Sequence, residues 1–157
     1  MSRTQIIDER DGGGNTDLMR AALLGQSETV KALLLSGADV NARNNEGRTA
    51  LMFAIVNLRT PTVQALLDFG ADVNVQASCG CTPLLLAAGS GDIGITRALL
   101  DSGADPGTIC GPGKTALVVA RERGYSAIVE LLGRALAQAV HAKPKSHRIG
   151  MRDLRWR

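Results

Sequence analysis

The chain has few aromatic residues and no long apolar run. Only 3% of its 157 residues are aromatic, so its core must be filled by Leu, Val, Ile and Ala instead of large rings. Such a core favours thin layers that pack closely, and it disfavours a pocket for a sugar or a nucleobase. No segment approaches the roughly 20 apolar residues that span a bilayer. We therefore expect no membrane association.

Cysteines are also scarce. The three in the chain are too few, and of the wrong parity, for a disulfide framework. The segment from Met1 to Gly14 is polar and contains no apolar stretch typical of a secretion signal. Both features predict a reducing, cytoplasmic location. Hydrophobic residues make up 45% of the chain, which excludes disorder throughout.

The net charge of +3 is unevenly distributed. Residues 1–133 contain 11 Lys and Arg against 14 Asp and Glu. Residues 134–157 contain seven Lys and Arg against a single acidic residue, Asp153. The basic character therefore belongs to the end of the chain and not to its body.

The same interval separates Gly14 from Gly47, Gly47 from Gly80 and Gly80 from Gly113, so the body of the chain has a constant period. Several residue types return four times in the same register, which excludes chance. The repeated columns are Gly14, Gly47, Gly80 and Gly113; Thr16, Thr49, Thr82 and Thr115; Leu18, Leu51, Leu84 and Leu117; Ala21, Ala54, Ala87 and Ala120; and Leu33, Leu66, Leu99 and Leu132.

Each period predicts two short helices. The repeated Thr is a suitable N-cap for the first helix, because its hydroxyl can accept a free backbone N–H. Glycine ends this helix in three repeats, but Leu58 stands there in the second, so we expect a different turn at that point. Glycines 37, 70 and 103 end the second helix. Such a helix pair cannot bury its apolar face alone, so the repeats must stack into a solenoid.

The period and its motif resemble the ankyrin repeat, most fully at Gly80, Thr82, Pro83, Leu84, Ala87 and Ala88. The resemblance covers residues 14–136 and implies an all-α ankyrin-repeat solenoid of helix-turn-helix units with short hairpin or turn fingers. The repeats would be 14–46, 47–79, 80–112 and 113–136, between a flexible segment 1–13 and a basic tail 137–157. The first repeat lacks a preceding hairpin.

One column departs from the family. A histidine often follows the Thr-Pro-Leu motif in ankyrin repeats, but this chain has Met19, Met52, Leu85 and Val118 there. We therefore expect the polar links that this histidine makes between neighbouring loops to be missing. The fingers would then be looser than in regular members.

The sequence offers little for catalysis or metal binding. Cys79, Cys81 and Cys110 form the only cluster with potential as nucleophiles or metal ligands. A structural zinc needs four ligands, and the only histidines, His141 and His147, lie in or near the tail. We interpret the cysteines as free thiols, and we predict no metal, no cofactor and no enzymatic activity.

The resemblance implies that the chain binds a partner protein or peptide on its concave side, through finger tips and first helices. Carrying the family's contact positions over by register gives a set of candidate residues outside the repeated columns. These are Arg43, Asn45, Glu46, Arg48, Val56, Asn57, Gln76, Ser78, Cys81, Ser90, Lys114, Glu122 and Arg123, with Leu23 and Leu24 adding apolar surface. The set lacks Tyr and Trp, the usual interface anchors, which predicts modest affinity or an anchor supplied by the partner.

An alternative function concerns the basic tail. Residues 137–157 could bind nucleic acid or an anionic surface by neutralising phosphates, and such binding falls steeply with salt. The tail could equally be a solvated end of the chain. For the body of the chain we predict a monomer that acts as a protein-interaction module.

Overall fold

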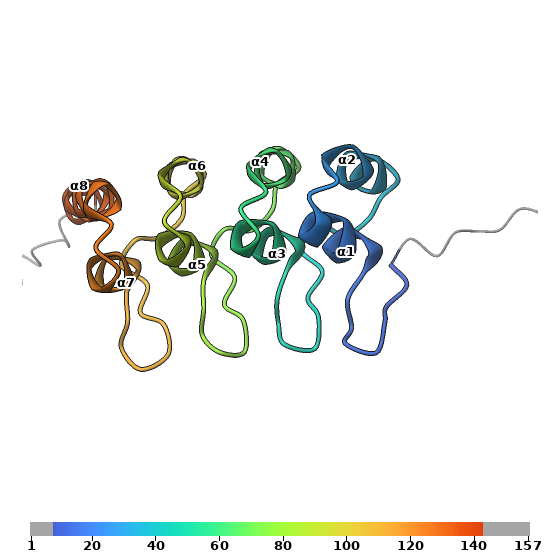
Figure 1. The fold of residues 1–157 in the computed structure, drawn as a ribbon, viewed down its shortest axis with the longest axis horizontal. Coiled ribbons are helices and arrows are strands. Elements are labelled where there is room, and N and C mark those ends of the chain that lie inside the picture. Colours follow the sequence, from blue (N-terminus) through green and yellow to red (C-terminus); the bar gives the residue numbers. More distant parts are fainter. Residues whose placement is uncertain (1–7, 143–157) are drawn as a thin grey trace, which may run out of the picture.

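The computed structural model describes residues 8–142, which form eight helices in four stacked pairs (Figure 1). The helices are α1 Asp17–Leu24, α2 Ser27–Leu35, α3 Ala50–Val56, α4 Thr60–Asp68, α5 Pro83–Ser90, α6 Ile93–Asp101, α7 Ala116–Glu122 and α8 Ser126–Ala142. This arrangement confirms the predicted all-α solenoid.

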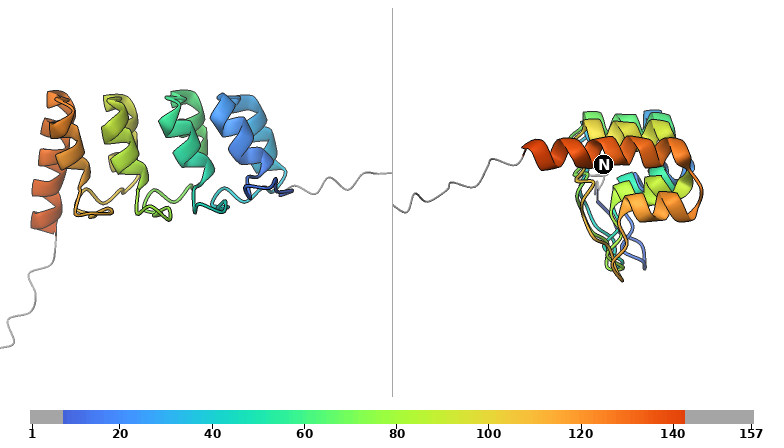
Figure 2. Two further views of the ribbon diagram at one scale, coloured as in Figure 1. Left: turned by 60° about the horizontal axis from the view of Figure 1, so that its bottom comes forward. Right: turned by 90° about the vertical axis from the view of Figure 1, so that its left-hand side faces the viewer.

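The helices form two rows (Figure 1). An inner row contains α1, α3, α5 and α7, each packed on the next, and an outer row contains α2, α4, α6 and α8. The loops that precede the inner helices project from the inner row as fingers, roughly across the helix axes (Figure 2). We call the side formed by the inner helices and the fingers the inner face.

Small residues allow the layers to approach closely. The alanine column at positions 21, 54, 87 and 120 is at most 4% exposed, and it lies where successive inner helices pack. The leucine columns fill the space between the rows, but Leu33 and Leu117 are only partly buried. These two residues belong to the first and last pairs, where the stack has no further neighbour on one side.

The turn after α3 matches the turns after α1 and α7, so the expectation that Leu58 gives a different turn is wrong. Leu58 adopts a φ of 54°, the left-handed conformation that Gly25 has at 75° after α1. The hydrogen bonds also match, since the N–H groups of Arg59 and Gln26 both reach back to the alanine of the repeated column. The packing of the repeats imposes this turn although leucine disfavours it.

Three of the four predicted Thr caps form. Thr16, Thr82 and Thr115 each accept a hydrogen bond from the backbone N–H three residues on. Thr49 has the same extended backbone but makes no such bond, and its buried hydroxyl oxygen has no partner within the described residues. The predicted cap at Thr49 is therefore wrong.

Hydrogen bonds from arginine and asparagine side chains join neighbouring repeats on the finger side of the stack. The Arg10 guanidinium donates to the carbonyl of Arg43 at 2.6 Å, and Arg43 donates to the carbonyl of Gln76 at the same distance. Nearer the outer helices, Asn41 accepts from the N–H of Asp72 at 2.7 Å. Neighbouring repeats are thus linked without the family's histidine, and the expectation of looser fingers stays a prediction.

The predicted boundaries need adjustment at both ends. Residues 11–15 form a turn like the other fingers, with the Asp11 N–H bonded to the carbonyl of Asn15, so the first repeat does have a finger before it. At the other end, α8 continues to Ala142 and includes residues assigned to the tail. Residues 143–157 lie outside the described residues, so the tail hypothesis stays a prediction. Among residues 8–142, no helix has the length and apolarity needed to cross a membrane.

Candidate partner-binding surface

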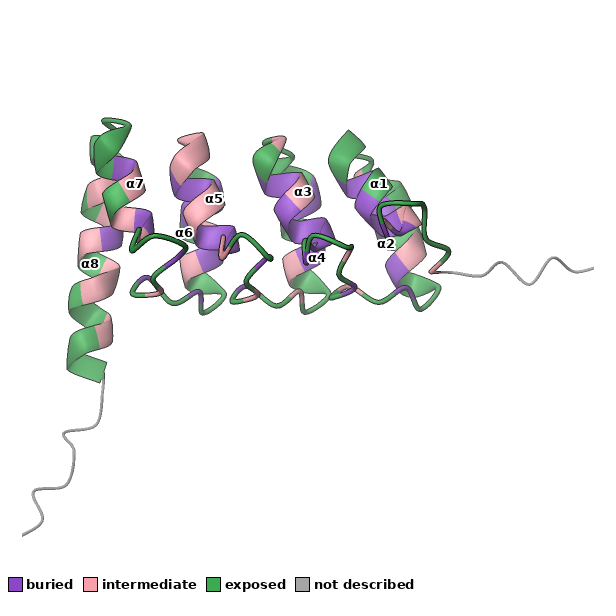
Figure 3. Ribbon diagram, turned by 90° about the horizontal axis from the view of Figure 1, so that it is seen from below, coloured by how far each residue is buried: buried purple, intermediate pink, exposed green. Residues whose placement is uncertain are grey.

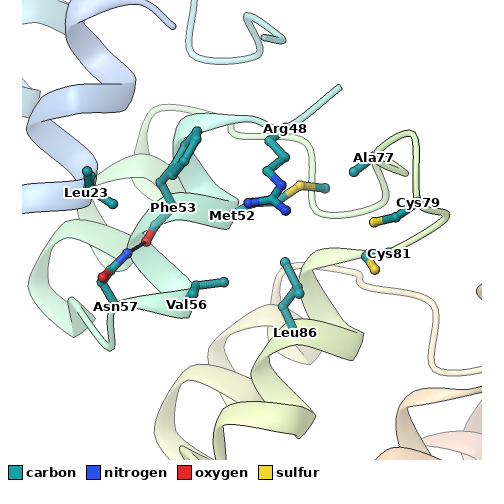
Figure 4. A pocket seen from close by; sticks show the side chains of 10 residues that line it. All are labelled: Leu23, Arg48, Met52, Phe53, Val56, Asn57, Ala77, Cys79, Cys81 and Leu86. Carbon is teal, nitrogen blue, oxygen red and sulfur yellow. Dashed lines mark hydrogen bonds between the residues drawn. The ribbon is translucent and has the colours of Figure 1, made fainter. Parts of the chain in front are cut away.

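A pocket of about 500 Å³ opens on the inner face between α1, α3, α5 and the second and third fingers (Figure 4). Apolar side chains dominate its lining. The lining residues are Leu23, Arg48, Met52, Phe53, Val56, Asn57, Ala77, Cys79, Cys81 and Leu86.

The sequence of the inner helices explains why the pocket is apolar. Met52 is buried, Phe53 and Leu86 are half-buried, and all three project toward the pocket (Figure 4). Leu23 and Val56 occupy the same register position in α1 and α3 and are 40% and 55% exposed. In both helices, the exposed residues lie mainly at the end away from the fingers (Figure 3). The apolar surface is therefore accessible to a ligand.

One charged side chain borders the pocket. Arg48 lies over it beside Met52 (Figure 4). The Arg48 Nε is 3.0 Å from a carboxylate oxygen of Glu46. A guanidinium carries five N–H donors, so this exposed ion pair leaves donors for a ligand. At the opposite rim, the Asn57 side chain donates to the carbonyl of Phe53 at 2.8 Å, which holds the amide near the end of α3.

Two thiols border the pocket from the third finger. The pKa of Cys79 is lowered, first by the Cys81 thiol and then by the Cys81 backbone N–H. The pKa of Cys81 is raised to about 11, mainly because this half-buried thiol is shielded from water. Adjacent thiols on one finger therefore have opposite shifts, with Cys79 as the more acidic of the two.

The pocket brings together five of the predicted contact residues: Leu23, Arg48, Val56, Asn57 and Cys81. Several others do not line it. Arg43 is occupied by its bonds to the carbonyls of Gly47 and Gln76, and Asn45 by its bond to the carbonyl of Gly12. Glu46 contributes as the ion-pair partner of Arg48, while Gln76 and Ser78 lie exposed on the third finger.

The remaining predicted residues belong to the other half of the inner face. Lys114 and Glu122 form an ion pair with 2.6 Å between Nζ and the carboxylate oxygen. Arg123 is exposed at the end of α7, and the Ser90 hydroxyl donates to the carbonyl of Ala87. This half of the face combines these polar groups with the exposed side chains of Ile109 and Val118.

Sequence reasoning missed Met52, Phe53, Ala77 and Leu86 as pocket residues, and it treated Cys79 only as a possible metal ligand or nucleophile. A signal for two of them existed. Phe53 and Leu86 stand one repeat apart in a column that is not fixed across the repeats, since Arg20 fills it in the first. Large apolar residues in a variable column can indicate a surface instead of a core.

The thiols do not form a metal centre with other residues. Within residues 8–142, no group of three or more His, Cys, Asp or Glu side chains is arranged to hold a metal ion. Cys110 is buried, with its sulfur 3.7 Å from the Thr82 hydroxyl, while Cys79 is exposed. The described geometry thus gives no support to the zinc alternative.

The stacked helix pairs and their fingers define a helical repeat solenoid with an open inner face. A family model described as ankyrin repeats (3 copies) matches residues 18–110 and again 60–143. The chain belongs to the ankyrin repeat family. Members of this family are generally protein–protein interaction modules and are typically not enzymes. A comparison with curated proteins gave no significant match.

Proposed function

We propose that the chain binds a segment of a partner protein on its inner face, anchored in the pocket between α1, α3 and α5. The pocket itself carries this proposal, because its volume falls within the range of about 300–1,000 Å³ found for ligand sites. Its lining is apolar, yet it lies open beside exposed Leu23 and Val56. An accessible apolar hollow of this kind suits an apolar side chain from another molecule.

The positive charge of Arg48 at the pocket rim indicates which charged group the partner should carry. Arg48 is the one charged residue that lines the pocket as described, and a guanidinium favours a carboxylate as partner. The pocket has no Tyr or Trp of its own, although such residues dominate interface hot spots. We therefore expect the partner to supply a large apolar or aromatic side chain, with an acidic residue close to it.

We further propose that binding occurs without catalysis and in the cytoplasm. The pocket lining contains no histidine and no carboxylate, the groups that most often serve as general acid or base. The three cysteines are free, which suits a reducing compartment. Both points support an interaction module.

Selection of peptides from a random displayed library against the full chain tests this function. Enriched peptides should share a large apolar residue with an acidic neighbour. Val56→Glu places a charge on the apolar surface, and Arg48→Glu removes the cation that would pair with the acidic residue. Each variant should weaken binding of a selected peptide at least about tenfold, which corresponds to about 1.4 kcal/mol. Leu35→Glu is the matched control, since Leu35 is 78% exposed on the outer row.

Folding of each variant is checked by circular dichroism. Equal binding by the native chain, Val56→Glu and Arg48→Glu would contradict the proposal. Loss of binding in Leu35→Glu alone would move the interface to the outer row.

A further inference from the structure

The two rows of the stack differ in charge. We define the inner layer as the inner helices with the fingers before them and the turns after them, and the outer layer as the outer helices with the loops after them (Figure 1). In the inner layer, residues 43–59, 76–92 and 109–125 contain six exposed Lys and Arg against three Asp and Glu. The six cations are Arg43, Arg48, Arg59, Lys114, Arg121 and Arg123. Residues 10–26 contain two of each sign, so the layer is positive as a whole.

The outer layer has the opposite sign. Its residues 27–42, 60–75 and 93–108 contain two Lys and Arg against six exposed Asp and Glu. The six acids are Glu28, Asp39, Asp68, Asp72, Asp101 and Asp105. Helix α8 contains one residue of each sign, Glu130 and Arg134. Because the two layers carry opposite charge, the field of residues 10–142 draws a negatively charged ligand to the inner layer and repels it from the outer one.

Hydrogen bonding leaves the positive charge of the fingers in place. The Arg43 guanidinium donates to the carbonyls of Gly47 and Gln76, and these neutral acceptors do not cancel its charge. Arg43 therefore contributes to the field although its donors are occupied. Direct contacts with a ligand must come from cations whose donors are partly free.

Arg48 and Lys114 meet this requirement. Arg48 pairs with Glu46 at 3.0 Å and Lys114 with Glu122 at 2.6 Å, and both cationic side chains are 47% exposed. Such exposed ion pairs are weak, and a guanidinium or an ammonium has more N–H donors than one carboxylate occupies. Each cation can therefore also bind a carboxylate of a ligand.

Arg48 and Lys114 also define a spacing. They occupy one register position two repeats apart, directly before Thr49 and Thr115. The same position in the repeat between them holds the uncharged Cys81. Packed helices lie about 8–10 Å apart, so two repeats span roughly 16–20 Å. An extended chain rises about 3.3 Å per residue and covers this span in about five or six residues, whereas an α-helix at about 1.5 Å per residue needs about 11–13.

The third finger favours an extended ligand. Gln76 and Ser78 lie exposed on this finger, between the fingers of Arg48 and Lys114. Their side chains can bond to the free N–H and C=O groups of an extended backbone, whereas a helix pairs these groups internally. An extended segment thus gains contacts here that a helical one does not.

We propose that the inner face binds an extended acidic segment that runs along the stack, with one carboxylate at Arg48 and a second, about five or six residues away, at Lys114. An apolar side chain next to the first carboxylate enters the pocket that Arg48 borders. This inference rests on the proposed function and adds to it the second contact, the conformation of the segment and its course. A nucleic acid would supply anions but no apolar side chain, so the pocket favours a peptide.

Peptides selected from a random displayed library against the full chain provide the probe, and their Kd is measured by fluorescence anisotropy. Enriched sequences should carry a second acidic residue about five or six positions from the first. Lys114→Glu should weaken binding of such a peptide at least about tenfold, and a peptide with lysine in place of the second acid should restore binding to this variant. Lys31→Glu is the matched control and should bind as the native chain does, since Lys31 pairs with Glu28 and is 48% exposed on the outer row.

Circular dichroism checks that each variant is folded, and rescue by the lysine peptide shows that the binding surface is intact. Acidic residues at no fixed spacing, or about 11–13 apart, would overturn the proposal, as would equal losses in Lys114→Glu and Lys31→Glu. Displacement of the peptide by a single-stranded DNA oligonucleotide at physiological salt would also overturn it, in favour of phosphate binding. A peptide weakened by Val56→Glu but not by Lys114→Glu contradicts this proposal alone, whereas failure to enrich any peptide contradicts the proposed function as well.

Discussion

Replacing Leu58 by glycine and by alanine measures the backbone strain that the repeat imposes on the turn after α3. Leu58 has a φ of 54° and repeats the hydrogen bonds of the glycine turn after α1. A residue with a Cβ pays roughly 1–2 kcal/mol in this conformation, and glycine does not. Both replacements remove the half-exposed side chain, so their difference isolates the backbone.

We expect Leu58→Gly to be more stable than Leu58→Ala by about 1 kcal/mol, because the relief of strain exceeds the entropy cost of glycine in the unfolded chain. For a chain of this size that corresponds to about 2–4 °C in Tm. Ala32→Gly is the matched control. Ala32 is exposed within α2, and there glycine should cost about 1 kcal/mol relative to alanine.

Urea unfolding followed by far-UV circular dichroism gives the free energies of unfolding of the native chain and all three variants. The preference for glycine should hold at position 58 and reverse at position 32. An alanine variant at 58 that is as stable as the glycine variant would refute the reasoning about strain.

Two further matched pairs test the packing of the fingers and the helix caps in the same urea assay. Gly70 and Gly80 share a φ of 79°, but only at Gly80 would a Cβ meet the backbone of the next finger at 2.8 Å. Gly80→Ala should therefore cost at least about 1 kcal/mol more than Gly70→Ala, and equal losses would contradict the close approach. Thr82→Val should cost about 1 kcal/mol because it removes a cap, whereas Thr49→Val should be neutral or stabilising because the Thr49 hydroxyl is buried without a partner. A larger loss at Thr49 than at Thr82 would contradict this assignment.

The period predicted the fold well because it reports on packing. Positions that must fit between neighbouring layers, such as Ala54 and Leu66, admit few residue types, so they recur in every repeat and are buried as expected. Local residue preference was less reliable. Leu58 and Thr49 were judged by what each residue prefers alone, and the stack overrides both preferences.

Contacts between fingers could not be predicted from residue types. The Arg43 guanidinium reaches a backbone carbonyl of the next finger, and the position of a carbonyl leaves no mark in the sequence. The pocket was half predicted for a similar reason. Arg48 and Val56 stood out because packing does not dictate them, whereas Met52 within a helix is ordinarily interpreted as core.

The difference between Cys79 and Cys81 was equally hidden. Their spacing predicted two nearby thiols, but burial of one and exposure of the other depend on how the third finger packs on the fourth.

The central claim, that a partner segment enters the inner-face pocket, can be tested through the methionine methyl groups. Met52 lines the pocket, while Met19, in the same register position one repeat earlier, does not, and both are 1% exposed. A selected peptide is titrated into the full chain labelled with ¹³C at the methionine methyls. We predict that the Met52 resonance shifts and saturates with the Kd of the peptide, while Met19 stays in place. A bound peptide that leaves Met52 unmoved would contradict the claim.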